Sequence, residues 1–286
     1  MTKVRIATRG SRLALAQAHR VAELLRSRAG VDDVELVEIQ TLGDHDRTSS
    51  LTRLSEVGAF VRAVQEAVLD RRADLAVHSL KDLPVTHPAG LEVVAFPERR
   101  SPHDVLVGSA LTALPARASV GTSSPRRATQ LQELRADLRT VPIRGNVDTR
   151  LDKVATGQPA AAVLAEAGLE RLGRLDAVAE RFPIDRMVPA PGQGALAVEA
   201  AAHTFGAEIG AVLDDPSLRP VLETERLLLA ETGAGCRSAL GALAEWEAGR
   251  IRLTAFVSDD TGSRRTVVVG DSPEEVVAEA RKELDL

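Results

Sequence analysis

The segment Val120-Gly121-Thr122-Ser123-Ser124-Pro125-Arg126-Arg127 has the pattern of a buried strand that turns directly into a helix. Serine at the N-cap position and proline at the first helical position predict that the helix begins at Pro125. Its first turn then carries two arginines, although the helix dipole favours anions at this end. An anion held between the helix N-terminus and the guanidinium groups would explain this arrangement. The alternative is a pair of surface arginines that bind no ligand.

Three other segments place basic residues at a predicted strand-to-helix junction: Arg9-Gly10-Ser11-Arg12, His78-Ser79-Leu80-Lys81-Asp82, and the stretch from Arg144-Gly145-Asn146 through Arg150. Parallel α/β sheets bind ligands beyond the carboxyl ends of their strands, where all four segments fall. Four such segments favour a ligand over surface arginines that happen to gather. We therefore expect a small polyanionic ligand, and we expect these arginines to act on its binding rather than on folding.

Strand and helix patterns alternate along the chain to about residue 200, which predicts mostly parallel sheets. A second set of these alternating elements begins near residue 101. The predicted strands are 4–8, 34–40, 75–77, 91–96, 105–107, 119–121, 138–143, 160–164 and 195–198, and the predicted helices start at Ser11, near Phe60, at Pro125 and at Asn146.

The last part of the chain has a different pattern. A helix is predicted over 216–230, followed by Gly233-Ala234-Gly235-Cys236. Strands over 251–257 and 265–269 form an antiparallel pair around Asp259-Asp260-Thr261-Gly262, and a capping box at 272–275 opens a final helix to Glu283. These elements predict a small α+β domain.

The composition limits the function classes. A chain of 286 residues suggests two or three domains, and 44% hydrophobic with 27% charged residues is ordinary for a globular protein. A net charge of −5, 2% aromatic residues and no tyrosine argue against nucleic-acid binding. No apolar run approaches the roughly 20 residues of a membrane span, so we expect no membrane partner. The sequence enters a strand pattern at once without a signal-peptide core, and we expect a cytoplasmic protein. We also expect a monomer.

The single cysteine, Cys236, lies in a turn of small residues beside Arg237, which could favour its thiolate. An inert turn cysteine and a covalent attachment point both remain open. One cysteine excludes an internal disulfide and a cysteine-built zinc site. Asp44-His45-Asp46 is too weak a pattern for a metal site, and we predict none.

Asp82 follows Lys81 at a predicted strand end, where it could form a structural ion pair or act as a general acid/base or counter-ion. His78 is expected to be a packed histidine. Pro191-Gly192-Gln193-Gly194 lacks the Lys-Ser/Thr pair of a phosphate-binding P-loop, which favours a turn or hinge between domains.

Six segments in order resemble the porphobilinogen deaminase (hydroxymethylbilane synthase) family. They are Arg-Ile-Ala-Thr-Arg-Gly-Ser at 5–11, Ala-Asp-Leu-Ala-Val-His-Ser-Leu-Lys-Asp-Leu-Pro at 73–84, Gly-Thr-Ser-Ser-Pro-Arg-Arg at 121–127, Ile-Arg-Gly-Asn-Val-Asp-Thr-Arg at 143–150, Pro-Gly-Gln-Gly-Ala at 191–195 and Gly-Cys at 235–236. Each segment is weak alone, and the six together cover the chain to about residue 245.

The resemblance implies two doubly wound domains like type II periplasmic binding proteins, plus a small C-terminal α+β domain with an antiparallel sheet. The expected boundaries are 1–97 with 195–214, 98–194, and 215–286. It also implies an enzyme, a deaminating transferase of tetrapyrrole and heme biosynthesis. Such an enzyme condenses four porphobilinogen molecules head to tail into hydroxymethylbilane, with release of ammonia, on a covalent dipyrromethane cofactor.

Position by position, the resemblance makes Cys236 the thioether anchor and Asp82 the catalytic carboxylate. The residues implied for cofactor binding are Ser79, Lys81, Thr122, Ser123, Ser124, Arg126, Arg127, Arg144, Arg150 and Gln193. Arg9, Ser11, Arg144 and Arg150 are implied for substrate carboxylates.

The sequence departs from the family pattern at several positions. Ser55-Glu56-Val57-Gly58 replaces a glycine-rich, sometimes basic loop, and Glu166 replaces a small apolar residue, where a buried carboxylate would weaken anion binding. Arg237 and Ala239 replace a polar residue and a proline. Glu166 and the altered segment 55–58 motivate one alternative, a degenerate deaminase that loads its cofactor without elongating it. A non-catalytic anion-binding module of the same fold is a second, separate alternative.

Overall fold

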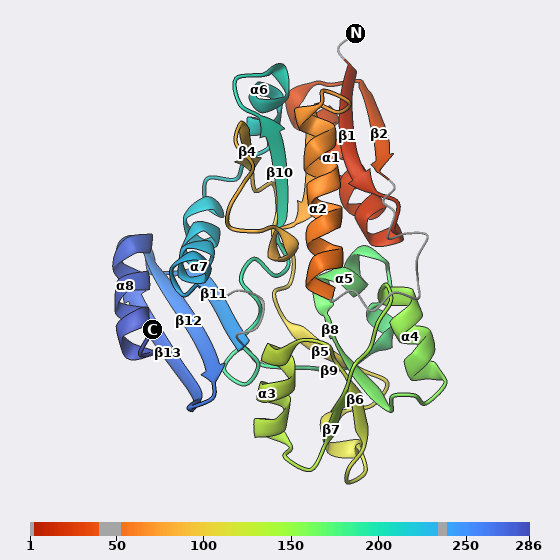
Figure 1. Cartoon of the computed structure of the whole chain (residues 1–286), viewed down its shortest axis with the longest axis vertical. Coiled ribbons are helices and arrows are strands. Elements are labelled where there is room, and N and C mark those ends of the chain that lie inside the picture. The colour runs from red at the N-terminus through yellow and green to blue at the C-terminus, as the bar shows by residue number, and fades with distance from the viewer. Residues whose placement is uncertain (1–2, 40–52, 234–238) are drawn as a thin grey trace. The chain divides into compact units, whose positions relative to one another are not determined.

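The computed structural model describes residues 3–39, 53–233 and 239–286. The chain divides into two compact units, shown with their elements in Figure 1. Unit 1 comprises Met1–Arg99 and Ala195–Arg219, and unit 2 comprises Arg100–Gly194 and Pro220–Leu286.

Unit 1 contains a five-stranded sheet in the order β2-β1-β3-β10-β4. β1 pairs in parallel with β2 and β3, whereas β10 runs antiparallel between β3 and β4. The bounds are Lys3–Arg9 for β1, Asp33–Ile39 for β2, Leu75–Ser79 for β3, Leu91–Ala95 for β4 and Leu196–Ala201 for β10. All five were predicted from the apolar pattern.

The helices of unit 1 are α1 (Arg12–Ala29), α2 (Arg53–Leu69) and α6 (Phe205–Ala211). Consecutive residues of β1 face different helices, since Ile6 packs in the core with α1 and Ala7 in the core with α2. This is the doubly wound arrangement. α2 begins earlier than predicted because Gly58, a poor helix former, interrupts the apolar pattern there.

Unit 2 repeats the order with β7-β6-β8-β5-β9. β6 pairs in parallel with β7 and β8, and β5 runs antiparallel between β8 and β9. The strands are β5 (Asp104–Val107), β6 (Ser119–Gly121), β7 (Arg139–Val141), β8 (Ala161–Ala165) and β9 (Val178–Arg181), and the helices are α3 (Pro125–Leu134), α4 (Val147–Ala155) and α5 (Glu166–Arg171). Short 3-10 helices lie at η2 (Leu80–Asp82) in unit 1 and at η3 (Leu111–Ala113) and η4 (Leu175–Ala177) in unit 2. The predicted pair of doubly wound domains is confirmed.

The C-terminal part of unit 2 forms a separate antiparallel sheet in the order β11-β12-β13. β11 (Ala239–Glu247) was not predicted, while β12 (Arg250–Asp259) and β13 (Gly262–Gly270) form the predicted pair. α7 (Arg219–Glu231) precedes this sheet, and α8 (Pro273–Glu283) packs against β12 and β13 (Figure 1). The Ser272 hydroxyl accepts a bond from the Glu275 amide at 3.2 Å, which confirms the predicted cap of α8.

The predicted small α+β domain with an antiparallel sheet is thus present. Its treatment as a separate domain over 215–286, and the exact boundaries of all three domains, stay predictions. Among the described residues, no helix combines the length and hydrophobicity that a membrane crossing requires.

Candidate functional site

In unit 1, the predicted site residues gather where the parallel strands β1 and β3 end. β1 ends at Arg9 and β3 at Ser79, and Ile6 of β1 lies opposite Leu75 of β3. The carboxyl ends of parallel neighbours meet at one sheet edge, so Arg9, Ser11, Lys81 and Asp82 belong to the same edge. The structure therefore supports their predicted proximity and leaves their roles as predictions.

At this edge two serines form hydrogen bonds within unit 1, and one arginine packs on an aromatic ring. Ser11 accepts a bond from the Ala14 amide at 3.3 Å as the N-cap of α1, and Ser79 accepts one from Gln17 Nε2 at 2.7 Å. The Arg9 guanidinium lies 3.9 Å from the centre of the Phe60 ring, in a cation–π contact. Both serines thus take part in local structure.

The η2 turn presents the charged pair Lys81 and Asp82 on the surface. Leu80 is buried beneath them, and its amide donates to the Ala195 carbonyl at 3.0 Å. The Leu83 amide closes the turn on the Leu80 carbonyl at 3.1 Å. A buried leucine therefore anchors a turn whose exposed carboxylate is open to a ligand.

In unit 2, the carboxyl ends of β6 and β7 carry the predicted serine and arginine segments. Ser123 Oγ donates to the Ile143 carbonyl at 3.0 Å and accepts from the Ile143 amide at 3.1 Å, which joins the two junctions. Ser124 caps α3 by accepting from the Arg127 amide, and the Thr122 hydroxyl accepts from the Ser124 amide at 3.2 Å. These hydroxyl groups fix the N-terminus of α3, where backbone N–H groups favour an anion.

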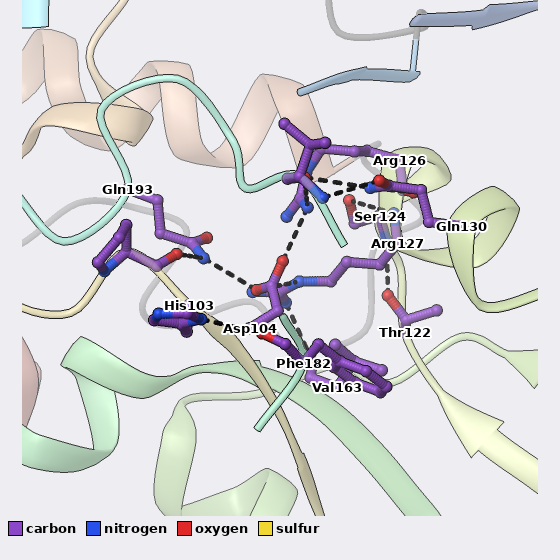
Figure 2. Close-up of polar contacts among 12 residues, drawn as sticks. His103, Asp104, Thr122, Ser124, Arg126, Arg127, Gln130, Val163, Phe182 and Gln193 are labelled. Carbon is purple, nitrogen blue, oxygen red and sulfur yellow. Dashed lines mark hydrogen bonds and ion pairs between the residues drawn. The ribbon is translucent and has the colours of Figure 1, made fainter. Parts of the chain in front are cut away.

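The Arg126 and Arg127 side chains converge on a buried carboxylate, Asp104, as Figure 2 shows. Arg126 Nη1 lies 2.7 Å from Asp104 Oδ2, and Arg127 Nε and Nη2 lie 2.9 and 2.6 Å from Asp104 Oδ1. Gln193 Nε2 donates to the same oxygen at 3.0 Å. Burial opposes ionisation of Asp104, but the two guanidinium groups outweigh it and hold the pKa of this carboxyl well below its usual range.

The Asp104 carboxylate therefore supplies, from within the chain, an anion that neutralises part of the positive charge of Arg126 and Arg127. The sequence pattern did not single out Asp104, whose only signal is a carboxylate directly before the apolar strand 105–107. The expectation that Arg126 and Arg127 contribute little to folding is replaced by the opposite one, because both side chains are buried in ion pairs. Their part in binding a ligand stays a prediction.

We expect Asp104→Asn to destabilise the protein by about 3–5 kcal/mol, because it leaves two buried guanidinium groups without their anion. Urea unfolding of the purified variant measures the change. Asp137→Asn is the matched control, since Asp137 forms an exposed pair with Arg135 at 2.7 Å and its loss should matter much less. Equal effects of the two substitutions would contradict a dominant role for the buried cluster.

Glu166 is buried, as considered from the sequence, but its negative charge is paired with Arg181. Arg181 Nε of β9 donates to Glu166 Oε1 at 2.9 Å, and the Ser101 hydroxyl contacts the second oxygen. The carboxylate therefore forms part of a local ion pair within unit 2. This pairing reduces the repulsion that an unpaired Glu166 would exert on an anionic ligand.

Three basic side chains, those of Arg144, Arg150 and Lys153, lie at or reach toward the N-terminal end of α4. Within the described residues, the Arg144 guanidinium is exposed and makes no hydrogen bond or ion pair. Arg150 Nε donates to the Gly145 carbonyl at 2.8 Å, and Lys153 Nζ to the Arg144 carbonyl at 3.0 Å. Asp148 adds one carboxylate to the same first turn. This donor set still suits carboxylate groups, because guanidinium forks and helix N-termini both bind them.

The predicted anchor Cys236 lies outside the described residues, as does Arg237, and the side chains of Ser55, Glu56 and Val57 are likewise not described. The turn at 191–194 is tied within unit 2 through Glu225 of α7, which accepts from the Gly192 amide at 2.6 Å and the Ala244 amide at 2.9 Å. Gln193 also donates to the Pro102 carbonyl at 2.7 Å, so its side chain serves the Asp104 cluster.

Comparison with known proteins identifies the family. Residues 4–206 match the family model described as "Porphobilinogen deaminase, dipyromethane cofactor binding domain". A porphobilinogen deaminase of Thermobifida fusca is 46% identical over 288 residues, covering 97% of this chain and 89% of that protein. One from Mycobacterium marinum is 47% identical over 246 residues, covering 85% and 77%, and a probable porphobilinogen deaminase of Methanopyrus kandleri is 41% identical over 283 residues, covering 97% and 95%.

Among solved structures, the periplasmic VFT2 domain of Bordetella pertussis BvgS is similar over 80% of this chain and 92% of that one, with 15% identity and a TM-score of 0.45. The match over residues 4–206 and the identities over most of the chain are decisive. The chain belongs to the porphobilinogen deaminase family.

Proposed function

We propose that this protein is a porphobilinogen deaminase that condenses four porphobilinogen molecules head to tail into hydroxymethylbilane and releases ammonia at each step. One observation carries the proposal: in a chain of this family, the edge formed by β1 and β3 presents an exposed carboxylate, Asp82, among the basic residues Arg9 and Lys81. Such an edge can bind an anionic substrate and stabilise positive charge in the same place.

Asp82 is the group proposed to act on the reacting substrate. Loss of ammonia breaks the C–N bond of the aminomethyl group and leaves positive charge on the pyrrole. A carboxylate fixed by the buried Leu80 turn stabilises that charge and accepts a hydrogen bond from the pyrrole N–H. The basic neighbours bind the acetate and propionate groups, which keeps the aminomethyl end near Asp82.

We expect Asp82→Asn to retain ligand binding and to lower kcat about a hundredfold, or roughly 3 kcal/mol, because the carboxylate acts only once charge develops. Steady-state kinetics on the cofactor-loaded protein would show a kcat effect much larger than the KM effect. A near-normal kcat would reassign Asp82 to a structural role in the η2 turn.

The residues of unit 2 fit a dipyrromethane cofactor by their chemistry. A group with several carboxylates suits Arg144, Arg150 and the N-termini of α3 and α4, which Thr122, Ser123 and Ser124 help to shape. The dipyrromethane would supply the pyrrole end onto which substrate is added. In the Asp104 cluster, two guanidinium charges and one carboxylate charge leave one net positive charge that also attracts a polyanion.

We expect protein from cells with an intact pathway to carry a two-pyrrole adduct on Cys236. The lone cysteine and the family match to a cofactor-binding domain support this anchor. Intact mass should show the adduct in wild type and its absence in Cys236→Ala, which should be soluble and inactive. An unmodified wild-type chain that still turns over porphobilinogen would disprove the covalent anchor, and an unmodified inactive one would favour a non-catalytic binding module.

Arg144 and Arg127 should differ in what their loss impairs. Arg144→Leu should leave urea stability within about 0.5 kcal/mol, because the side chain is exposed, yet reduce cofactor loading about tenfold to a hundredfold. Arg127→Leu should lower stability, because it removes one partner of Asp104. Urea unfolding curves and adduct mass of both variants measure stability and cofactor loading. Normal loading in Arg144→Leu would disprove a role of Arg144 in binding the cofactor.

The pairing of Glu166 with Arg181 weakens one of the two sequence-based reasons for a degenerate deaminase, and the altered segment 55–58 remains the other. Cytoplasmic location and a monomeric state stay predictions from the sequence.

A further inference from the structure

A buried carboxylate in unit 1 has no role in the function proposed above. Glu199 lies on β10, and its side chain is 0% exposed. Its oxygens lie 3.0 Å from His78 Nε2 and 2.8 Å from His87 Nδ1. Gln65 Nε2 of α2 lies 3.1 and 3.0 Å from the same two oxygens. A carboxylate in a sheet core persists only with such partners.

The charge of Glu199 is held by these contacts. Burial opposes ionisation, but the close contacts with His78, His87 and Gln65 lower the pKa of Glu199 to about 2, below its ordinary value of 4.5. Because the folded pKa is the lower one, the stabilisation is fully present above about pH 4.5 and is lost as the pH falls through about 2. Glu199 is therefore an anion near neutral pH.

The two histidines lie at opposite ends of one segment. His78 is on β3 and is buried, as predicted, directly before Ser79 and the η2 turn. His87 follows η2 and is half-buried. Lys81 and Asp82 lie between them in the sequence. A single carboxylate thus contacts a histidine at the start and a histidine at the end of the segment 78–87.

We propose that Glu199 is a positioning residue that clamps both ends of segment 78–87 through His78 and His87 and so fixes Asp82 for catalysis. This proposal rests on the proposed function of Asp82. A displacement of about 1 Å at a catalytic group can lower a rate about a hundredfold. The Leu80 contact fixes the middle of the segment, and His87 joins its far end to β10.

Thr86, which lines a pocket beside α2, offers a control substitution for this proposal. The pocket has a volume of about 780 Å³, and Gln65, Thr86 and His87 are among its lining residues. Thr86 lies next to His87 and is exposed, and among the described residues its side chain makes no hydrogen bond with Glu199. A change at Thr86 therefore alters the pocket and the segment but not the clamp.

The first measurement compares kinetics of cofactor-loaded variants. We expect Glu199→Gln and His87→Leu to lower kcat at least tenfold with KM within about twofold. His87→Asn should recover most of the activity, because its amide nitrogen can occupy the place of Nδ1. Thr86→Ala should match wild type. If Glu199→Gln does not fold, the two His87 variants still decide the question, since His87 lies nearer the surface.

The second measurement is hydrogen–deuterium exchange over peptides covering 78–90 in the same proteins. Faster exchange in His87→Leu, restored in His87→Asn, together with the kcat loss supports the clamp. Faster exchange with normal kcat would show a purely structural contact and overturn positioning, and unchanged exchange would overturn the clamp itself. A wild-type protein without deaminase activity would instead overturn the proposed function, while exchange still reports on the clamp.

Discussion

The ion pairs of Asp104 with Arg126 and Arg127 are the interaction on which unit 2 depends. All three side chains are less than a tenth exposed, and each buried ion carries a desolvation cost of several kcal/mol. Good geometry offsets this cost, because the remaining donors reach the Val163 carbonyl at 3.0 Å and the Val188 carbonyl at 2.6 Å. The cluster therefore joins β5, β8, α3 and the turn after Val188 into one hydrogen-bonded body, and it fixes the helix start that faces the carboxyl edge.

The position of Asp104 follows from sheet topology. An antiparallel strand among parallel ones begins where its neighbours end, and Asp104, the first residue of β5, lies opposite Ala165, the last residue of β8. The same holds in unit 1, where Leu196 at the start of β10 lies opposite Ser79 at the end of β3. In unit 2, the reversed strand therefore begins with a carboxylate at the edge that carries the cationic segments. In unit 1 the buried carboxylate Glu199 stands three residues into β10, opposite Ala76 near the start of β3, and so lies deeper in the sheet than Asp104 does.

The sequence predicted features that depend on near neighbours and missed those that depend on distant ones. The caps of α1, α3, α4 and α8 each use a side chain and an amide three residues apart, so a local pattern reveals them. Asp104 and Arg127 are 23 residues apart, and Glu199 and Gln65 are 134 apart, so only the fold brings them together. β11 escaped prediction because its sequence ALGALAEWE has no β-branched residue, and pairing with β12 along its whole length forms the strand.

The arginines that first indicated an anionic ligand therefore divide into two kinds with different physics. Arg126 and Arg127 are held by Asp104 and contribute one net positive charge from a buried position, where salt screens it weakly. Arg144 is exposed, and the contact proposed between it and a ligand is a direct hydrogen bond that salt would weaken. On a chain with a net charge of −5, this combination concentrates positive potential at the sheet edge without making the protein basic. We therefore expect such an edge to bind a small polyanion rather than a nucleic acid, whose binding needs a broad basic surface.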